Sequence, residues 1–340
     1  MKTVKTRVLA GFAIVVAALA APATSLAAPG GDPVVGSRSL GDPLLPQLGN
    51  GGYDVQHYTI KLDYDPVANR FNSAKTTIVA VASAKLQEFS LDFQDDLEVR
   101  SVTVDRRDAD FRFEAATPPL SDDPEVTQPM KLVVTPRPSS RPLAGREFTV
   151  VIQYRGSPQP ITDPDTSIEG WIQACFPLNP PRTCDGAFVV NEPMGAQSWF
   201  PSNNYPTDKA TFDTIITVPN AKTALGVGEL VERTDNRDGT STWHWYEDDP
   251  SATYLTTATV GDFTYTVGSM VETSTGVTLP VYNAIDSTAS ATQLAAINAS
   301  LARAPDQINF LSDLYGPYPF DSTGAVADRA AGVGYALEVQ

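Results

Sequence analysis

Short runs of alternating apolar and polar residues constrain the fold of this chain more than any other feature. The clearest run is YDVQHYTIKLDYD at 53–65, where Tyr58, Ile60 and Leu62 alternate with polar side chains. A period of two is typical of a strand with one buried face. Similar runs, separated by Pro, Gly and Asp clusters, recur at 76–84, 89–93, 97–104, 111–115, 130–136, 147–154, 210–219, 224–233, 241–248, 254–267 and 277–284. So many short strands without intervening helices predict a mostly β fold, an antiparallel β-sandwich or saddle-like pair of sheets.

A helical period appears only after residue 286. Apolar residues then recur at steps of three and four, as expected for one face of a helix: Leu294, Ile297, Leu301, Ile308, Leu311 and Leu314. Asp286 or Ser290 could cap its start. Pro305 lies inside the pattern and is expected to kink the helix or split it in two. The remainder, 315–340, predicts a loop followed by a strand. One helix and one or two strands do not form an independent core, so this part resembles the beginning of a second domain.

The N-terminus, residues 1–28, has the features of a secretory signal peptide. Three basic residues precede the apolar run at 8–20, and small residues follow it. That run is too short to span a bilayer comfortably, although an uncleaved anchor remains an alternative. No later segment is expected to cross a membrane, so we predict a secreted, extracellular protein. In that compartment Cys175 and Cys184 are expected to form a disulfide that shapes a proline-rich surface loop.

Composition excludes two further classes of function. The 340 residues contain 24 Lys and Arg against 40 Asp and Glu, a formal charge of −16, which argues against a nucleic-acid partner. Two histidines and two cysteines are too few for a zinc site built by this chain alone. His57 and His244 lie within predicted strands and are interpreted as surface or interface rings rather than catalytic bases.

Four segments, in order, resemble the aminopeptidase N family of zinc metallopeptidases (gluzincin aminopeptidases). YDVQHYTIKLDYDP at 53–66 is similar to the opening strand of the family, and SATYLTTATVGDF at 251–263 to a later strand. NEPMGAQSWFPSNNYPTDKATFDTIITVP at 191–219 is the most specific match. LYGPYPF at 314–320 and GYALE at 334–338 resemble the segment that leads into the G-A-M-E-N motif of the family.

The resemblance implies a domain layout. In this layout residues 53–264 form a β-saddle domain and 265–340 begin a thermolysin-like α/β catalytic domain. Residues 29–52, rich in Gly, Pro, Leu and Asp without a period, are expected from their composition to be an extended leader segment. In the family, the H-E-x-x-H zinc motif follows G-A-M-E-N, so this chain corresponds to an N-terminal portion that ends before it. The intact family enzyme uses Zn²⁺, whereas this chain alone is expected to bind none and to be inactive.

The resemblance also implies substrate-binding residues. Glu338 matches the Glu of G-A-M-E-N, Glu192 matches an acidic residue from the saddle domain, and the backbone of Ala336 and Leu337 would run beside the substrate. Paired carboxylates in a closed site suit a free α-ammonium, because desolvation strengthens charge-assisted hydrogen bonds. Without the resemblance, both glutamates would be interpreted as exposed strand-end carboxylates. Asn204 stands where the family commonly has Asp, a change expected to affect stability more than chemistry.

The hypothesis is therefore the N-terminal part of a secreted zinc aminopeptidase acting on peptides with a free N-terminus. The alternative is a non-catalytic secreted β-sandwich that binds protein or peptide. An H-E-x-x-H sequence in the codons after Gln340 would favour the first, and a genuine stop codon with normal expression the second.

Overall fold

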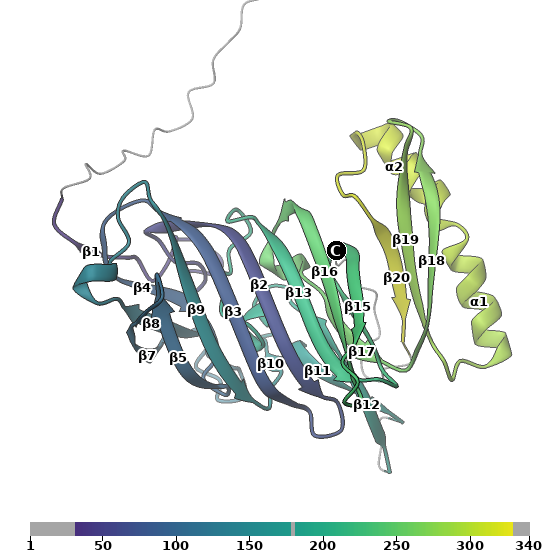
Figure 1. Ribbon diagram of the computed structural model, residues 1–340, viewed down its shortest axis with the longest axis horizontal. Coiled ribbons are helices and arrows are strands. Elements are labelled where there is room, and N and C mark those ends of the chain that lie inside the picture. The colour runs from purple at the N-terminus through teal and green to yellow at the C-terminus, as the bar shows by residue number, and fades with distance from the viewer. Residues whose placement is uncertain (1–30, 178–180, 329–340) are drawn as a thin grey trace, which may run out of the picture.

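The computed structural model describes residues 31–177 and 181–328. Within them the strands form four sheets, and two α-helices lie near the C-terminal end (Figure 1). The signal-peptide prediction falls on residues 1–28, outside the described residues. No helix in the described ranges has the length and apolar character needed to cross a membrane.

A sheet of eight strands forms the largest layer, in the order β15-β16-β13-β2-β3-β9-β5-β6 (Figure 1). Its strands are β2 (Tyr53–Asp65), β3 (Arg70–Ala82), β5 (Glu98–Val104), β6 (Arg107–Asp108), β9 (Glu147–Gly156), β13 (Ala210–Pro219), β15 (Glu229–Asp235) and β16 (Thr240–Ser251). Neighbours are antiparallel except for the parallel pair β13 and β2. Tyr58, Ile60 and Leu62 of β2 are buried, as their alternation predicts.

Two smaller sheets pack against the large one. The first comprises β1 (Val34–Val35), β4 (Leu86–Asp92), β8 (Met130–Thr135) and β7 (Asp110–Ala115). The second comprises β10 (Ile161–Thr162), β11 (Ile168–Phe176), β12 (Thr183–Val190), β17 (Ala258–Gly261) and β14 (Thr223–Gly226). One core cluster joins all three sheets: Trp171 of β11 lies 4.9 Å from the rings of both Tyr64 and Phe71. The predicted β-sandwich is therefore confirmed.

Strands β11 and β12 were not predicted from the sequence. The segment containing Cys175 and Cys184 was interpreted as a loop, whereas both cysteines lie in these antiparallel strands as register partners, joined by a disulfide. The loop interpretation was wrong at these two positions. Proline residues after Phe176 hid the pattern, and the burial of consecutive residues in β11 breaks a simple alternation.

Two predicted runs each contain two strands. The run at 224–233 divides into β14 and β15, which belong to different sheets. Gly228 lies between them with φ +83°, and a Cβ atom there would approach Tyr246 O to 2.0 Å. Only glycine therefore fits where the chain passes from one sheet to the other. The run at 254–267 divides into β17 and β18 (Phe263–Glu272).

The C-terminal part contains β18, β19 (Val277–Asp286), β20 (Thr323–Ala327), α1 (Ala291–Leu301) and α2 (Ala304–Tyr315). The predicted split at Pro305 is confirmed, because that proline occupies the first turn of α2. Ser290 caps α1 and forms a capping box with Gln293. This architecture fits the predicted start of a second domain. Tyr265 of β18 contacts the rings of Trp243 and Trp245 at 5.9 and 6.3 Å, which ties this part to the saddle.

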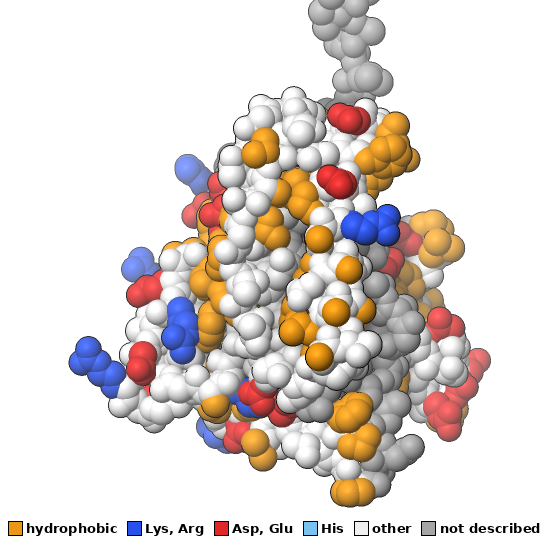
Figure 2. Space-filling model, turned by 90° about the vertical axis from the view of Figure 1, so that its right-hand side faces the viewer, with side chains coloured by type: hydrophobic (Ala, Val, Ile, Leu, Met, Phe, Trp, Pro, Cys, Tyr) orange, Lys and Arg blue, Asp and Glu red, His pale blue; other side chains and the backbone are white. Residues whose placement is uncertain are grey.

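The apolar helical face is only partly covered within the described residues: Ile297, Leu301 and Ile308 are half-buried. Leu294, Leu311 and Leu314 retain 41, 49 and 59% exposure. Figure 2 views the molecule from this side and shows hydrophobic side chains reaching the surface.

Candidate functional site

Glu192 lies directly after β12, in the turn that leads to a short 3₁₀-helix at Gly195–Ser198. Its peptide bond to Pro193 is cis. The side chain is exposed at the wall of a cavity of about 240 Å³. In the described part of the chain, no hydrogen bond or ion pair engages the Glu192 carboxylate. The Glu192 carboxylate therefore faces the cavity with no protein partner among the described residues.

Segments far apart in the sequence form the other walls of this cavity. Asp42 and Leu48 come from the leader segment, Tyr205 from the loop between Pro201 and Pro206, and Tyr254 from the segment before β17. Backbone N–H groups of Leu45 and Leu44 donate to Asp42 Oδ1 at 2.9 and 2.8 Å and hold the pKa of that carboxyl below its usual value. The cavity thus combines two carboxylates with aromatic and aliphatic walls.

The turn that carries Glu192 is held by buried side chains on both sides. Asn191 donates from Nδ2 to the Thr256 carbonyl at 2.5 Å and accepts from Trp199 Nε1 at 3.0 Å. Asn204 Nδ2 donates to the Pro193 carbonyl at 3.0 Å. These bonds fix the backbone that presents Glu192, so its position is set by the fold rather than by its own contacts.

A carboxylic acid pair lies beneath the same turn. Glu169 is 1% exposed, and its Oε2 accepts from the backbone N–H groups of Met194 and Gly195 at 2.9 and 2.8 Å. Burial, with Asp163 as a second cause, raises the pKa of Glu169 to about 9. Burial also raises the pKa of Asp163, and its hydrogen bond with Glu169 opposes that rise. Glu169 therefore stays protonated near neutral pH and donates to Asp163.

Asn204 connects the Glu192 turn to a buried ion pair. Asp92 Oδ2 accepts from the Asn204 backbone N–H at 2.9 Å, and Lys131 Nζ contacts Asp92 Oδ1 at 2.6 Å. Lys131 and Asp92 are 1 and 0% exposed. The sequence interpretation linked Asn204 to stability; the structure places it in direct contact with Pro193 as well. No local pattern signals Glu169, Asp92 or Lys131 as partners of this site.

The two histidines converge on one aspartate of the large sheet. His57 Nε2 lies 3.0 Å from Asp213 Oδ2, and His244 Nε2 lies 2.5 Å from Oδ1. Burial acts to raise the pKa of Asp213, but the hydrogen bonds to both rings outweigh it and leave the pKa below its usual value. Between 31 and 328, leaving out 178–180, no three His, Cys, Asp or Glu side chains are grouped as a metal ion requires.

Glu338, Ala336 and Leu337, the other substrate-binding residues expected from the sequence, lie outside the described residues. The structure thus neither joins them to Glu192 nor separates them from it.

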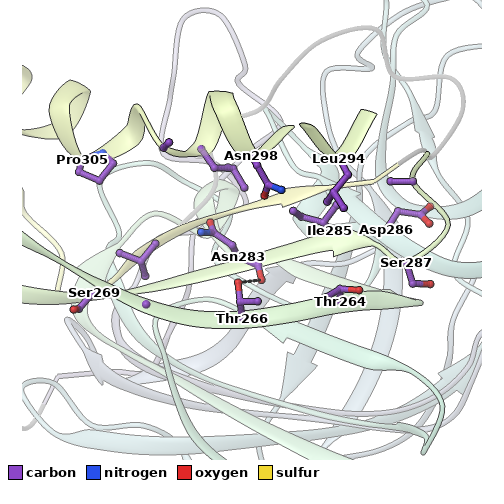
Figure 3. Close-up of a pocket in the computed structure, with 15 residues that line it drawn as sticks. Thr264, Thr266, Ser269, Asn283, Ile285, Asp286, Ser287, Leu294, Asn298 and Pro305 are labelled. Carbon is purple, nitrogen blue, oxygen red and sulfur yellow. Dashed lines mark hydrogen bonds between the residues drawn. The ribbon is translucent and has the colours of Figure 1, made fainter. Parts of the chain in front are cut away.

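A second cavity, of about 510 Å³, lies between the helices and the sheet formed by β18 and β19 (Figure 3). Thr264, Thr266 and Asn283 face it from the strands, and Asn298 from α1. Asp286 is the one carboxylate among the described residues that line it. The cavity lacks the paired charged groups seen around Glu192, so we assign no chemistry to it.

Comparison with protein families identifies the larger part of the chain. The sequence profile of the Peptidase M1 N-terminal domain matches residues 54–255, more than half of the chain. The chain belongs to the M1 peptidase family. No curated protein sequence gives a significant match.

Solved structures agree with the M1 assignment at the level of the fold. A mutant M1 zinc metallopeptidase from Deinococcus radiodurans, bound to a Tyr-Ser-Ala substrate, superposes with a TM-score of 0.69 at 24% identity. The unmutated M1 zinc metallopeptidase from that organism gives a TM-score of 0.68 at 23% identity. Both alignments cover 85% of this M1 chain and 59% of the metallopeptidase, so the chain spans somewhat more than half the length of these relatives.

Proposed function

We propose that this chain is the N-terminal region of an exported zinc aminopeptidase, and that Glu192 binds the free α-ammonium of a peptide substrate. The observation that carries the proposal is the Glu192 carboxylate itself, which is held by a rigid turn at a cavity wall and engages no partner among the described residues. Membership of the M1 peptidase family supports a hydrolytic role for the complete protein. The relative bound to Tyr-Ser-Ala supports a peptide as substrate.

The chemistry of the carboxylate explains the proposed preference for a free N-terminus. An ammonium donates charge-assisted hydrogen bonds to a carboxylate, whereas an internal peptide nitrogen carries no charge. Exposed as it is here, Glu192 would gain little from such a contact because water competes. We therefore propose that Glu338, with the Ala336 and Leu337 backbone beside the substrate, completes and closes the site. Zn²⁺ belongs to the intact enzyme in this proposal.

Export is proposed from the N-terminal sequence. The predicted signal peptide at 1–28 and the disulfide between Cys175 and Cys184 both fit an oxidising compartment. Expression with the native leader, followed by N-terminal sequencing of protein in the medium, tests this. Release of a chain that begins near Ala28 or Pro29 supports export, and retention of an intact leader in the cell contradicts it.

Glu192→Ala and Glu192→Gln, in the form of the protein that continues through the zinc-binding sequence, test the amine-binding role. With aminoacyl anilides, we expect both variants to lose about tenfold or more in kcat/KM, equivalent to about 1.4 kcal/mol. N-acetylated anilides, which lack the ammonium, serve as the matched comparison. Equal losses on free and acetylated substrates would show that Glu192 does not recognise the amine.

A further inference from the structure

The turn that presents Glu192 is anchored from below by one side chain that the sequence did not single out. Glu169, at the start of β11, accepts hydrogen bonds from two successive backbone N–H groups, Met194 at 2.9 Å and Gly195 at 2.8 Å. Both groups lie within three residues of Glu192. A buried carboxyl that engages two adjacent amides restricts the backbone more than one bond would.

The turn also packs closely against the neighbouring backbone at Gly195. A Cβ atom on Gly195 would lie 2.0 Å from Val190 O and 2.6 Å from Gly170 N, so the turn sits directly against β11 and the end of β12. Gly170 follows Glu169 in the chain. The same short stretch therefore supplies both the contact surface and the hydrogen-bond acceptor.

The Glu169 carboxyl is itself fixed by Asp163, in the turn that follows β10. Each carboxyl group shifts the pKa of the other, and one oxygen of each, Glu169 Oε1 and Asp163 Oδ1, is buried with no N–H or O–H donor among the described residues. A single proton held between them satisfies both atoms. Asp165 is the further charged group that acts on this pair, through Asp163.

We infer that Glu169 is a positioning residue for substrate binding, because its buried carboxyl accepts from two successive backbone N–H groups and so fixes the turn that carries Glu192. This inference rests on the proposed function of Glu192. Glu169 touches no substrate in this account and acts only through the backbone of Met194 and Gly195.

Hydrogen exchange on residues 31–340 tests the anchoring without any catalytic activity. In Glu169→Ala, the Met194 and Gly195 amides should exchange about tenfold faster than in the wild type, relative to amides elsewhere in the same sample. Glu169→Gln keeps an acceptor for the two amides and a donor for Asp163, and should retain protection. Unchanged protection of both amides in Glu169→Ala would overturn the inference.

Kinetics in the form that carries the zinc-binding sequence test the positioning role. Glu169→Ala should raise KM for a free-amine anilide about tenfold with a smaller change in kcat, while Glu169→Gln stays within about twofold of the wild type. Glu272→Ala is the matched control, since that carboxylate also accepts two backbone N–H groups, from Ser274 and Thr275, in the distant β18–β19 hairpin.

The outcomes separate the two proposals. If Glu192→Ala raises KM and Glu169→Ala does not, Glu192 binds the amine and the positioning role is wrong. If Glu169→Ala and Glu272→Ala change KM alike, Glu169 has only a structural role and the inference fails. If Glu192→Ala leaves kcat/KM for the free-amine anilide unchanged, the proposed function fails, whatever hydrogen exchange reports about the anchor.

Discussion

Because Glu169 is protonated in the folded protein, the free energy of unfolding should decrease as pH rises. A single substitution, Glu169→Gln, should remove this contribution to the pH dependence. In the unfolded chain this carboxyl ionises near its ordinary pKa of 4.5, whereas burial and Asp163 raise the folded value to about 9. Between these values the folded protein binds one more proton than the unfolded chain. The free energy of unfolding therefore decreases as pH rises across that window and is largest below it.

The expected size follows from the proton count. One extra proton in the folded state gives a slope of about 1.4 kcal/mol per pH unit, or about 3 kcal/mol between pH 6 and pH 8. Glu169→Gln removes this contribution, because an amide does not titrate while it still accepts from Met194 and Gly195 and donates to Asp163. The free energy of unfolding of Glu169→Gln should therefore increase relative to that of the wild type as pH rises.

Urea unfolding of residues 31–340 at pH 6, 7 and 8, followed by tryptophan fluorescence, measures the effect. The wild-type and variant curves share every other titrating group, including Asp208, whose pKa is raised to about 7 by burial. The difference between the two proteins is therefore attributed to Glu169 together with Asp163, whose pKa depends on it. A difference that stays constant from pH 6 to pH 8 would refute the protonated-acid reasoning.

Two further predictions concern stability. Lys131→Met leaves Asp92 charged, buried and without its cation, and should lower the free energy of unfolding by about 3–5 kcal/mol in urea titrations. The control substitution Lys209→Met, at an exposed position, should change it by less than about 0.5 kcal/mol. Equal effects of the two substitutions would contradict the buried-pair interpretation. Replacing Cys175 and Cys184 by serine opens a loop with a sequence separation of 9 and should cost about 2–3 kcal/mol, measured by thermal and urea unfolding. No change on that replacement would show that the hairpin is held without the disulfide.

The sequence predicted those parts of the fold that depend on local periodicity. Alternation located β2 and β13 at the bounds observed, and Pro305 located the division between α1 and α2. β11 was missed because consecutive buried residues and the following prolines carry no period of two. Periodicity records which face of a strand is buried, and not which distant segment covers it.

In the candidate site too, the sequence predicted what depends on a local motif and missed what depends on tertiary contacts. Glu192 was predicted from the family resemblance of the motif at 191–219 that contains it. Its anchors were not, because Glu169 and Asn204 reach the turn only through tertiary contacts. A buried acid beside another acid also contradicts the usual expectation for charged residues, and only the folded arrangement brings Glu169 and Asp163 together.

The proposed role of Glu192 is tested by the position of the N-terminus of a bound peptide. A crystal structure of the form that extends through the zinc-binding sequence, with a tripeptide bound, would measure the distance from the peptide's N-terminal nitrogen to the Glu192 carboxylate. We expect a hydrogen bond at about 2.7–3.2 Å, with Glu338 on the opposite side of the same ammonium. A peptide whose N-terminus lies away from Glu192, or a structure in which the two glutamates occupy unconnected faces, would contradict it.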